Sequence, residues 1–207
     1  TPTELISLTA FYKLIKNPIS RIEVASAGGY LSYENIADKA TVAGVEVEVR
    51  KNLFVRPLSS AANGMNKLSF GLNGSYIYTN AKMPLATVTT GSQLEGAAPW
   101  IANFDLSHNF TKGNHSFINT LVFNYVSDKI YTIGTQGYQD IIEQGMMTLD
   151  FVSQAKLNKY VSLTLKARNL LNPSYKLSRK ANESGEKVVL SDYKKGINIS
   201  LGVSCTF

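Results

Sequence analysis

The sequence lacks the features that define several large classes of protein. Its single cysteine, Cys205, has no partner in the chain, so a disulfide-stabilised scaffold is excluded. No apolar run approaches the roughly 20 residues that a transmembrane helix requires. The chain opens with Thr1-Pro2-Thr3-Glu4 and not with a charged and then apolar secretory signal. If the protein is exported, we therefore expect a mature form or a fragment.

Charged residues are also sparse, at 17% of the 207 residues, and they do not gather in one place. The formal net charge is +6, yet the densest basic group is only Lys194-Lys195. No recognition-helix pattern accompanies the basic residues, so the sequence argues against a nucleic-acid partner. With 44% hydrophobic residues, the chain has the composition of a folded protein rather than a disordered one.

What the sequence does contain is alternation of apolar and polar residues. From Ile197 to Phe207 every odd position is apolar, and every even position is polar or glycine. This period of two indicates a strand with one apolar face and one polar face. Similar patterns predict eight strands with approximate cores at residues 4–14 (or 4–24), 41–51, 67–79, 99–111, 115–131, 145–157, 160–179 and 188–207.

The predicted strands are long for a soluble protein, in which strands usually have about 5–6 residues. Segments of about ten alternating residues suit strands that cross a bilayer at a tilt. In hydrocarbon such strands must close into a barrel, because an open edge leaves backbone groups unpaired. We therefore expect an all-β fold: an antiparallel, up-and-down transmembrane β-barrel with its apolar face toward lipid.

The connections between the predicted strands alternate in length. Short turns fall at 111–115 and 157–160, and longer loops at 25–35, 80–99, 134–144 and 181–187. Outer-membrane barrels have short periplasmic turns and longer external loops, so this pattern predicts a periplasmic C-terminus. The segment 52–66 is too long for a short turn, and the alternation does not explain it.

Four segments carry a resemblance to a known family. Residues 43–53 read AGVEVEVRKNL, residues 96–103 read GAAPWIAN, residues 167–173 read ARNLLNP, and residues 193–196 read YKKG before the last predicted strand. In this order and spacing they resemble the C-terminal part of TonB-dependent outer-membrane receptors, especially those of Bacteroidetes. The matches cover most of the chain.

The resemblance implies a larger assembly, because barrels of this kind have 22 strands and enclose a plug. Residues 1–207 would then be the C-terminal part of the barrel, without plug, signal or TonB-contacting segment. The implied function is TonB-coupled uptake of a bulky, scarce nutrient across the bacterial outer membrane. The implied partners are outer-membrane lipid, the rest of the barrel and its plug, the TonB complex and the barrel-assembly machinery.

Two other functions remain open on the sequence alone. One is a self-contained eight-strand outer-membrane barrel that acts as an adhesin or structural anchor. The other is a soluble lipocalin-like or sandwich module that binds a ligand. No catalytic motif is present, and His108 and His115 lack the spacing and the cysteine neighbours of a metal site. We therefore expect neither an enzyme nor a cofactor.

The candidate functional residues fall into three groups. Loop tyrosines that could stack on a ligand, or simply pack in their loops, are Tyr30, Tyr33, Tyr131 and Tyr138. Charges on the polar faces should point into the lumen, because Arg or Lys at the lipid midplane costs ~2–4 kcal/mol. These charges, which would pair with one another or contact the plug, are Glu46, Glu48, Arg50, Asp105, Asp150, Lys166 and Arg168.

The third group is aromatic. Rings that could form interfacial girdles, or the core of a soluble protein, are Tyr76, Tyr78, Trp100 and Phe110. The final residue, Phe207, is either one more girdle residue or, by similarity to outer-membrane proteins, part of the signal that the barrel-assembly machinery reads.

Overall fold

The computed structural model describes residues 4–24, 29–58, 64–83, 92–135, 137–181 and 185–206. Within these ranges every regular element is a β-strand, and fourteen strands are present. They form one large sheet and two small ones. The predicted all-β, antiparallel fold is confirmed.

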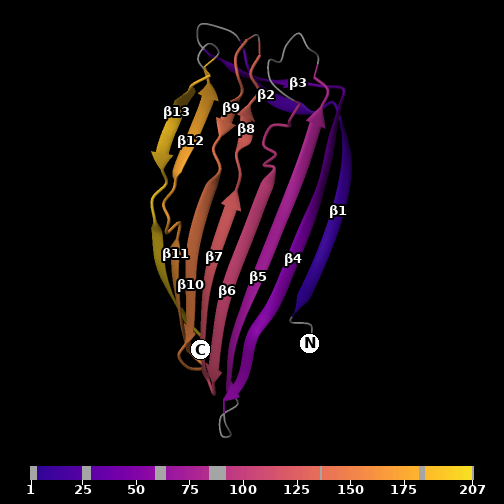
Figure 1. The fold of residues 1–207 in the computed structure, drawn as a ribbon. Helices are drawn as coiled ribbons and strands as arrows, with labels where there is room; N and C mark the ends of the chain where they lie inside the picture. Colours follow the sequence, from indigo (N-terminus) through magenta and orange to yellow (C-terminus); the bar gives the residue numbers. More distant parts are fainter. Residues whose placement is uncertain are drawn as a thin grey trace.

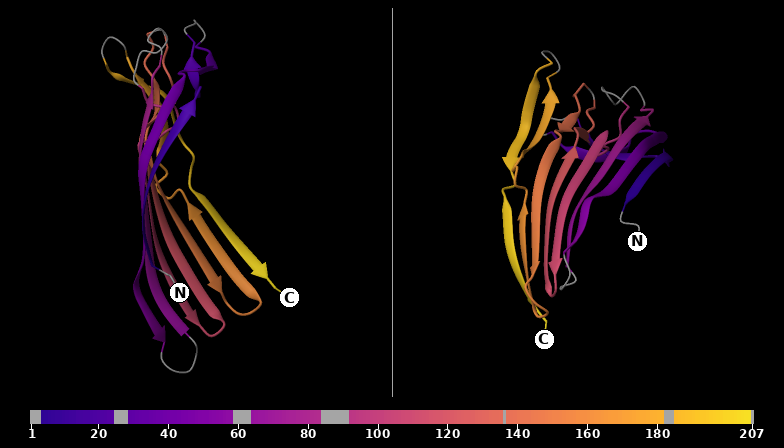
Figure 2. Two further views of the ribbon diagram at one scale, coloured as in Figure 1. Left: turned by 90° about the vertical axis from the view of Figure 1, so that its right-hand side faces the viewer. Right: turned by 60° about the horizontal axis from the view of Figure 1, so that its bottom comes forward.

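Eight strands form the large sheet, which we call the main sheet. In spatial order they are β1 (Leu5–Lys16), β4 (Lys39–Leu58), β5 (Gly64–Ala81), β6 (Trp100–Lys112), β7 (His115–Val126), β10 (Met146–Lys156), β11 (Val161–Arg168) and β14 (Asn198–Cys205). All neighbours are antiparallel. Figures 1 and 2 show a single curved layer whose two edges, β1 and β14, bend toward the same side. Within the described ranges no ladder joins these two edges.

The connections alternate between the two ends of the main sheet, as the sequence predicts. The β6–β7 and β10–β11 connections are short and lie at the lower end in Figure 1. The β1–β4, β7–β10 and β11–β14 connections lie at the other end, and each contains two further strands. The main sheet therefore has one end with short turns, which we call the simple end, and one end with long connections, which we call the elaborate end.

The segment 52–66 is not a long turn. β4 continues to Leu58 and β5 begins at Gly64, so the two strands form one extended hairpin. Their register shifts between Asn52 and Phe54, which marks a β-bulge at Leu53. A bulge adds one residue to one strand and so breaks the period of two. This is why the alternation of β4 ends near Lys51 although the strand does not.

Six further strands lie at the elaborate end, beyond the main sheet. A four-stranded sheet contains β8 (Lys129–Thr132), β9 (Ile141–Glu143), β12 (Ser174–Lys180) and β13 (Lys187–Lys194). A hairpin of β2 (Ile19–Glu23) and β3 (Leu31–Asn35) joins it through a parallel bridge between Ile22 and Ile133. We call these six strands, together with residues 92–99, the mouth layer.

Three of the predicted strands are wrong in extent, because each one is broken. The predicted strand 115–131 is interrupted at 127–128, the strand 160–179 at 169–173, and the strand 188–207 at 195–197. Asn169 and Asn172 have φ values of 58° and 44°, and Gly196 has a φ of 83°. An extended strand cannot contain such left-handed residues, and Asn and Gly are the residues that tolerate them best. Similarly, Asn17, with φ 48°, separates β1 from β2.

The buried hydrophobic residues of the described chain all lie at the mouth end. They are Ile22, Ile36, Ala37, Ala40, Ala81, Leu94, Ala98, Ile130, Ile133 and Ile141. Ile133 is completely buried, and most of the others surround it in one cluster. The mouth layer therefore has a conventional protein core, whereas the main sheet below it is a single layer.

Candidate ligand-binding wall and membrane-facing surface

One face of the main sheet is apolar and exposed. At the β1 edge Ile6 is 83% exposed, and at the β14 edge Leu201 is 71% exposed. Even on an interior strand, Leu121 keeps 37% of its surface exposed. No described residue covers this face, so its side chains require an apolar environment outside the sheet.

The apolar positions on this face continue across the sheet. On β4 they include Val45, Val47 and Val49 and, beyond Lys51 and the bulge, Phe54, whose partner Leu68 lies on the same face. On β14 they continue to Val203. A continuous apolar face backed by a polar one is the pattern of strands that cross a membrane in a barrel.

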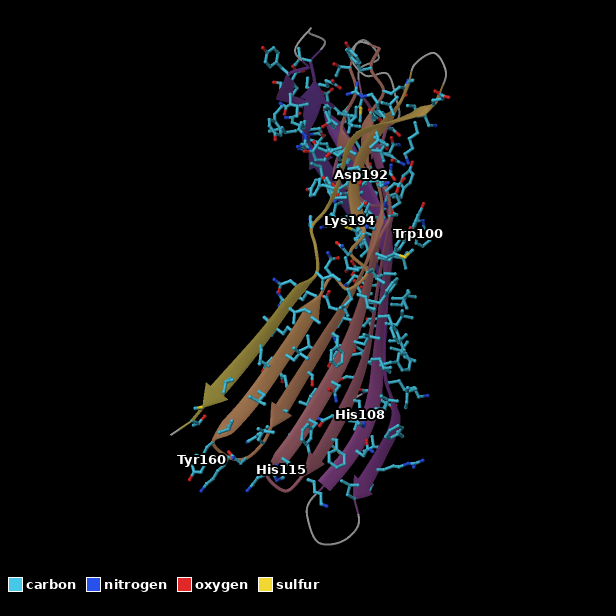
Figure 3. All side chains as sticks on the ribbon, turned by 90° about the vertical axis from the view of Figure 1, so that its left-hand side faces the viewer. Trp100, His108, His115, Tyr160, Asp192 and Lys194 are labelled. Carbon is cyan, nitrogen blue, oxygen red and sulfur yellow. The ribbon has the colours of Figure 1, made fainter. Side chains whose placement is uncertain are left out.

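The predicted girdle residues share this apolar face. Tyr76 and Trp100 lie near the mouth end with ring centroids 4.6 Å apart, and Tyr78 follows on the same face of β5. Phe110 lies near the short turns, 6.5 Å from Phe117. Figure 3 shows Trp100 projecting from the convex side, so the apolar face is the outer one. Their location at the lipid interface stays a prediction, and Phe207 lies outside the described residues.

The opposite, concave face is polar and brings several predicted lumen residues into one row. Arg50, Gly71, Asp105, Val122 and Asp150 are successive partners on five neighbouring strands. Gly71 makes room for the Asp105 carboxylate, since a Cβ at this position would collide with it. The sheet therefore aligns charges that are far apart in the sequence.

The charges on this face differ from one side of the sheet to the other. On β4, Arg50 Nε donates to Glu48 Oε1 at 2.7 Å, and Glu46 lies one row further along. On β11, Lys166 and Arg168 form no ion pair with any described residue. Between them lies a row of neutral groups, in which Asn103 donates to Asn73 at 3.4 Å and Asn124 donates to Thr148 at 3.2 Å.

Two of the predicted ligand tyrosines meet at Arg21 in the mouth layer. The Arg21 guanidinium carbon lies 3.7 Å from the centre of the Tyr131 ring, and its Nη2 lies 3.3 Å from Glu95 Oε1. Tyr33 is the strand partner of Arg21 and is 68% exposed. The structure therefore places both tyrosines beside one cation.

The other two predicted tyrosines are placed separately. Tyr30 is 70% exposed beside the end of the β2–β3 hairpin. Tyr138 lies 5.6 Å from the guanidinium carbon of Arg179, which itself pairs with Glu23 at 2.5 Å. The four residues therefore do not form a single cluster.

A cavity of about 450 Å³ lies where the polar face of the main sheet meets the mouth layer. We call it the wall pocket. It is lined by Met146, Thr148, Asp150, Arg168, Asn169, Pro173, Tyr175, Lys195, Gly196 and Asn198. Asp150 and Arg168 are predicted lumen residues, whereas Tyr175 and Lys195 were not expected from the sequence.

The ARNLLNP segment shapes this pocket. Asn169 N–H donates to Asp150 Oδ1 at 2.8 Å, and Asn169 Nδ2 donates to the Gly196 carbonyl at 2.7 Å. Gly196 N–H in turn donates to Asn172 Oδ1 at 3.0 Å. The two asparagines therefore fasten the break in one strand to the break in the next. Asn residues followed by proline favour a turn, a signal that could have predicted this break.

Tyr175 forms the upper wall of the pocket. Its ring lies 5.0 Å from that of Tyr193, and Lys195 Nζ lies 5.4 Å from its centre. Burial, followed by the nearby Glu143 carboxylate, raises the pKa of Tyr175 to about 12. The phenol therefore stays protonated at physiological pH, hydrogen-bonded to Glu143.

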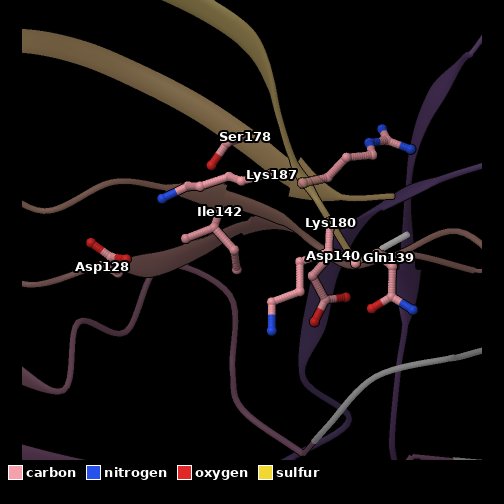
Figure 4. A pocket seen from close by; sticks show the side chains of 9 residues that line it. Asp128, Gln139, Asp140, Ile142, Ser178, Lys180 and Lys187 are labelled. Atoms are coloured by element: carbon pink, nitrogen blue, oxygen red, sulfur yellow. The ribbon is translucent and has the colours of Figure 1, made fainter. Parts of the chain in front are cut away.

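A second pocket, of about 370 Å³, lies within the mouth layer (Figure 4). Asp128 and Asp140 line it together with Arg179, Lys180 and Lys187, so its formal charge is 3 − 2 = +1. Asp140 also accepts the Gly134 N–H at 2.8 Å. Across the described ranges, no cluster of three His, Cys, Asp or Glu could hold a metal ion. The same ranges contain no helix that is long and apolar enough to span a membrane.

The exposed apolar outer face and the polar inner face are the two surfaces expected of the wall of an outer-membrane β-barrel. The sequence model of the family described as TonB dependent receptor-like, beta-barrel, matches residues 2–170. The chain therefore belongs to the β-barrel family of TonB-dependent receptors. No curated protein and no solved structure matches it.

Membership gives the chain a general role. Its family consists of outer-membrane receptors and transporters, which work with a plug and with TonB. The Bacteroidetes character of the sequence motifs stays a prediction.

Proposed function

We propose that the chain is the C-terminal part of the barrel wall of a receptor that imports a bulky, scarce nutrient by TonB-coupled transport. The observation that carries this proposal is the exposed apolar band on the convex face, backed by a polar concave face. Strands with this pattern suit a tilted crossing of lipid beside a wet or plugged lumen. Family membership supports the same function.

Each surface has a role in the proposal. The convex face contacts lipid, and its aromatic residues lie at the two interfaces. The concave charges line the lumen and contact the plug, while the mouth tyrosines contact the nutrient. Energy comes from the proton-motive force, through TonB acting on the plug.

The two edges of the main sheet support a larger barrel. β1 and β14 each present a row of backbone groups without a described strand partner. In a membrane such rows must be paired, so further strands of the receptor would pair with both edges. Phe207 would then contribute to recognition by the barrel-assembly machinery, as the alternation before it supports.

The transport proposal can be tested by deleting the gene. We expect the deletion strain to grow more slowly on one limiting nutrient in a panel of siderophores, cobalamin, haem, oligosaccharides and peptides. The gene should restore growth and labelled uptake only when TonB is functional. Uptake that is restored equally well without TonB would contradict the proposal.

The lipid contact can be tested with Trp100, the single tryptophan of the chain. In vesicles that contain brominated lipid, we expect quenching of the fluorescence that is lost in Trp100→Phe. Bromine near the headgroups should quench this signal more than bromine near the chain ends, because tryptophan prefers the interface. A Trp100 signal that is unaffected by brominated lipid would refute the lipid-facing assignment.

A further inference from the structure

The two cations of the wall pocket have no counter-ion among the described residues. The described ion pairs join Arg21 to Glu95, Arg50 to Glu48, Lys129 to Glu143, Lys176 to Asp192 and Arg179 to Glu23. None of them includes Arg168 or Lys195, which both line the wall pocket. The pocket contains one acid, Asp150, so its formal charge is 2 − 1 = +1.

Strand pairing and the contacts at the chain break determine where the two cationic residues lie. Arg168 is the last paired residue of β11, opposite Asn198 of β14. Lys195 lies beside the Tyr175 ring, and the next residue, Gly196, is held by Asn169 and Asn172. Asp150 is partly engaged by the Asn169 N–H, so it does not simply neutralise Arg168.

These groups match the chemistry of a carboxylate. A planar guanidinium can donate two parallel hydrogen bonds to a carboxylate, and an ammonium group adds a second charged contact. A carboxylate carried on a carbon skeleton can contact both the cations and the apolar lining, whereas inorganic phosphate has no carbon skeleton to contact that lining. Tyr175, Pro173 and Met146 offer apolar surface to the carbon skeleton that bears the carboxylate.

We infer that the wall pocket binds a carboxylate group through Arg168 and Lys195. The inference rests on the proposed function, in which this pocket faces the lumen just below the mouth. The carboxylate can belong to the imported solute or to an acidic side chain elsewhere in the receptor. In either case it supplies the counter-ion that the described chain lacks.

The test uses the natural gene product, purified from outer membranes in detergent. Binding of succinate, dimethyl succinate and inorganic phosphate is measured by saturation-transfer NMR. We expect succinate to bind, its uncharged ester not to bind, and phosphate to bind more weakly than succinate. Arg168→Gln and Lys195→Gln should each weaken succinate binding about tenfold, the loss expected for one charge-assisted hydrogen bond.

Lys166→Gln is the matched control. Lys166 lies on the same face of β11 two residues before Arg168, but it does not line the pocket. The Lys166→Gln substitution also removes one positive charge, but from outside the pocket. The affinity for succinate should therefore stay near that of the unaltered receptor. An equal loss in Lys166→Gln would mean that only the general charge of the wall matters, and the inference would fail.

A second measurement identifies an internal source of the carboxylate. If an acidic side chain of the receptor already fills the pocket, succinate gives no signal. Arg168→Gln/Lys195→Gln should then lower the thermal unfolding midpoint well below that of Lys166→Gln. Equal binding of succinate and its ester, tighter binding of phosphate, or neither binding nor a lowered midpoint would overturn the inference.

The same preparations separate this inference from the proposed function. Outer-membrane location and heat-modifiable gel mobility are recorded for every variant. A receptor that is correctly located but fails the carboxylate tests overturns only the pocket assignment. A receptor that is absent from the outer membrane overturns the proposed function as well.

Discussion

The mouth layer buries its apolar side chains, whereas the main sheet exposes them on its convex face. In the mouth layer Ile22, Ile130 and Ile133 pack against one another and are almost fully buried. In the main sheet Ile6, Leu201 and their neighbours project outward from a single layer. One chain thus contains a region that supplies its own core and a region whose apolar face needs lipid.

The two regions also differ in how they use charge. The mouth layer joins distant segments through ion pairs of low exposure, such as Glu23 with Arg179, whose side chains are 12% and 16% exposed. On the concave wall the described ion pair, Glu48 with Arg50, is more exposed, at 31% and 67%. Among the described residues, the ion pairs of lowest exposure therefore lie in the mouth layer.

The largest expected effect comes from a charge on the convex face. Leu121→Arg places a guanidinium in the apolar band and should cost about 2–4 kcal/mol in unfolding from lipid vesicles. Val122→Arg is the control on the concave face, where Asp105 and Asp150 flank it in the same row. It should cost much less. Similar losses in both variants would refute the assignment of the two faces.

A smaller effect is expected from breaking a mouth ion pair. Glu23→Gln removes the charge that Arg179 contacts at low exposure and should destabilise the mouth layer by about 1–3 kcal/mol. Glu48→Gln breaks an exposed pair on the wall and should cost under about 1 kcal/mol. Limited proteolysis measures local opening of the mouth strands, and unfolding of the whole receptor measures global stability. Glu23→Gln should increase the protease sensitivity of the mouth strands more than Glu48→Gln does. Equal protease sensitivity would remove the contrast between the regions.

The junction between the regions should be sensitive to Asn169. Asn169→Ala loses the hydrogen bond to Gly196 and strains a residue with φ 58°, so a cost of about 1–2 kcal/mol is expected. Asn169→Gly relieves the backbone strain and should recover part of this loss. Hydrogen exchange at residues 195–197 reports the change. If Asn169→Gly is as destabilising as Asn169→Ala, strain in the left-handed backbone does not explain the loss of stability.

The smallest expected effect is a pH dependence confined to the mouth layer. The pKa of Tyr175 is raised from 10.0 to about 12, so the folded state holds its proton more tightly than the unfolded state. The protonated Tyr175 therefore contributes to the free energy of unfolding. This contribution is complete below pH 10 and is lost as the pH rises toward 12. Tyrosinate absorbance should show one late-titrating group that disappears in Tyr175→Phe, while Tyr30→Phe leaves it in place.

Much of the main sheet could be predicted from the sequence, because each strand's own residues record which of its two faces is apolar. A face toward lipid and a face toward the lumen impose a period of two on every crossing, from Ile6 on β1 to Val203 on β14. The pattern failed only where the backbone departs from ideal extension. Leu53 adds a residue at a bulge, and Asn169 and Asn172 turn the chain.

The mouth layer could not be predicted in the same way, because its contacts are not local. Glu23 and Arg179 are 156 residues apart, and Arg21 hydrogen-bonds across 110 residues to the Tyr131 carbonyl. The strands that bring them together are short and lie within loops. For the wall pocket, alternation predicted that Asp150 and Arg168 face inward. Lys195 was missed because it lies in the break between β13 and β14.

The coincident breaks in the last two crossings separate two hydrogen-bonded ladders. The β11–β14 ladder ends at Arg168 and Asn198, and the β12–β13 ladder begins at Ser174 and Lys194. Insertions or deletions on the mouth side of this seam can thus alter the β12–β13 hairpin without shifting the register of the β11–β14 ladder. Sequence divergence could therefore accumulate in the hairpin while the paired strands below it stay the same.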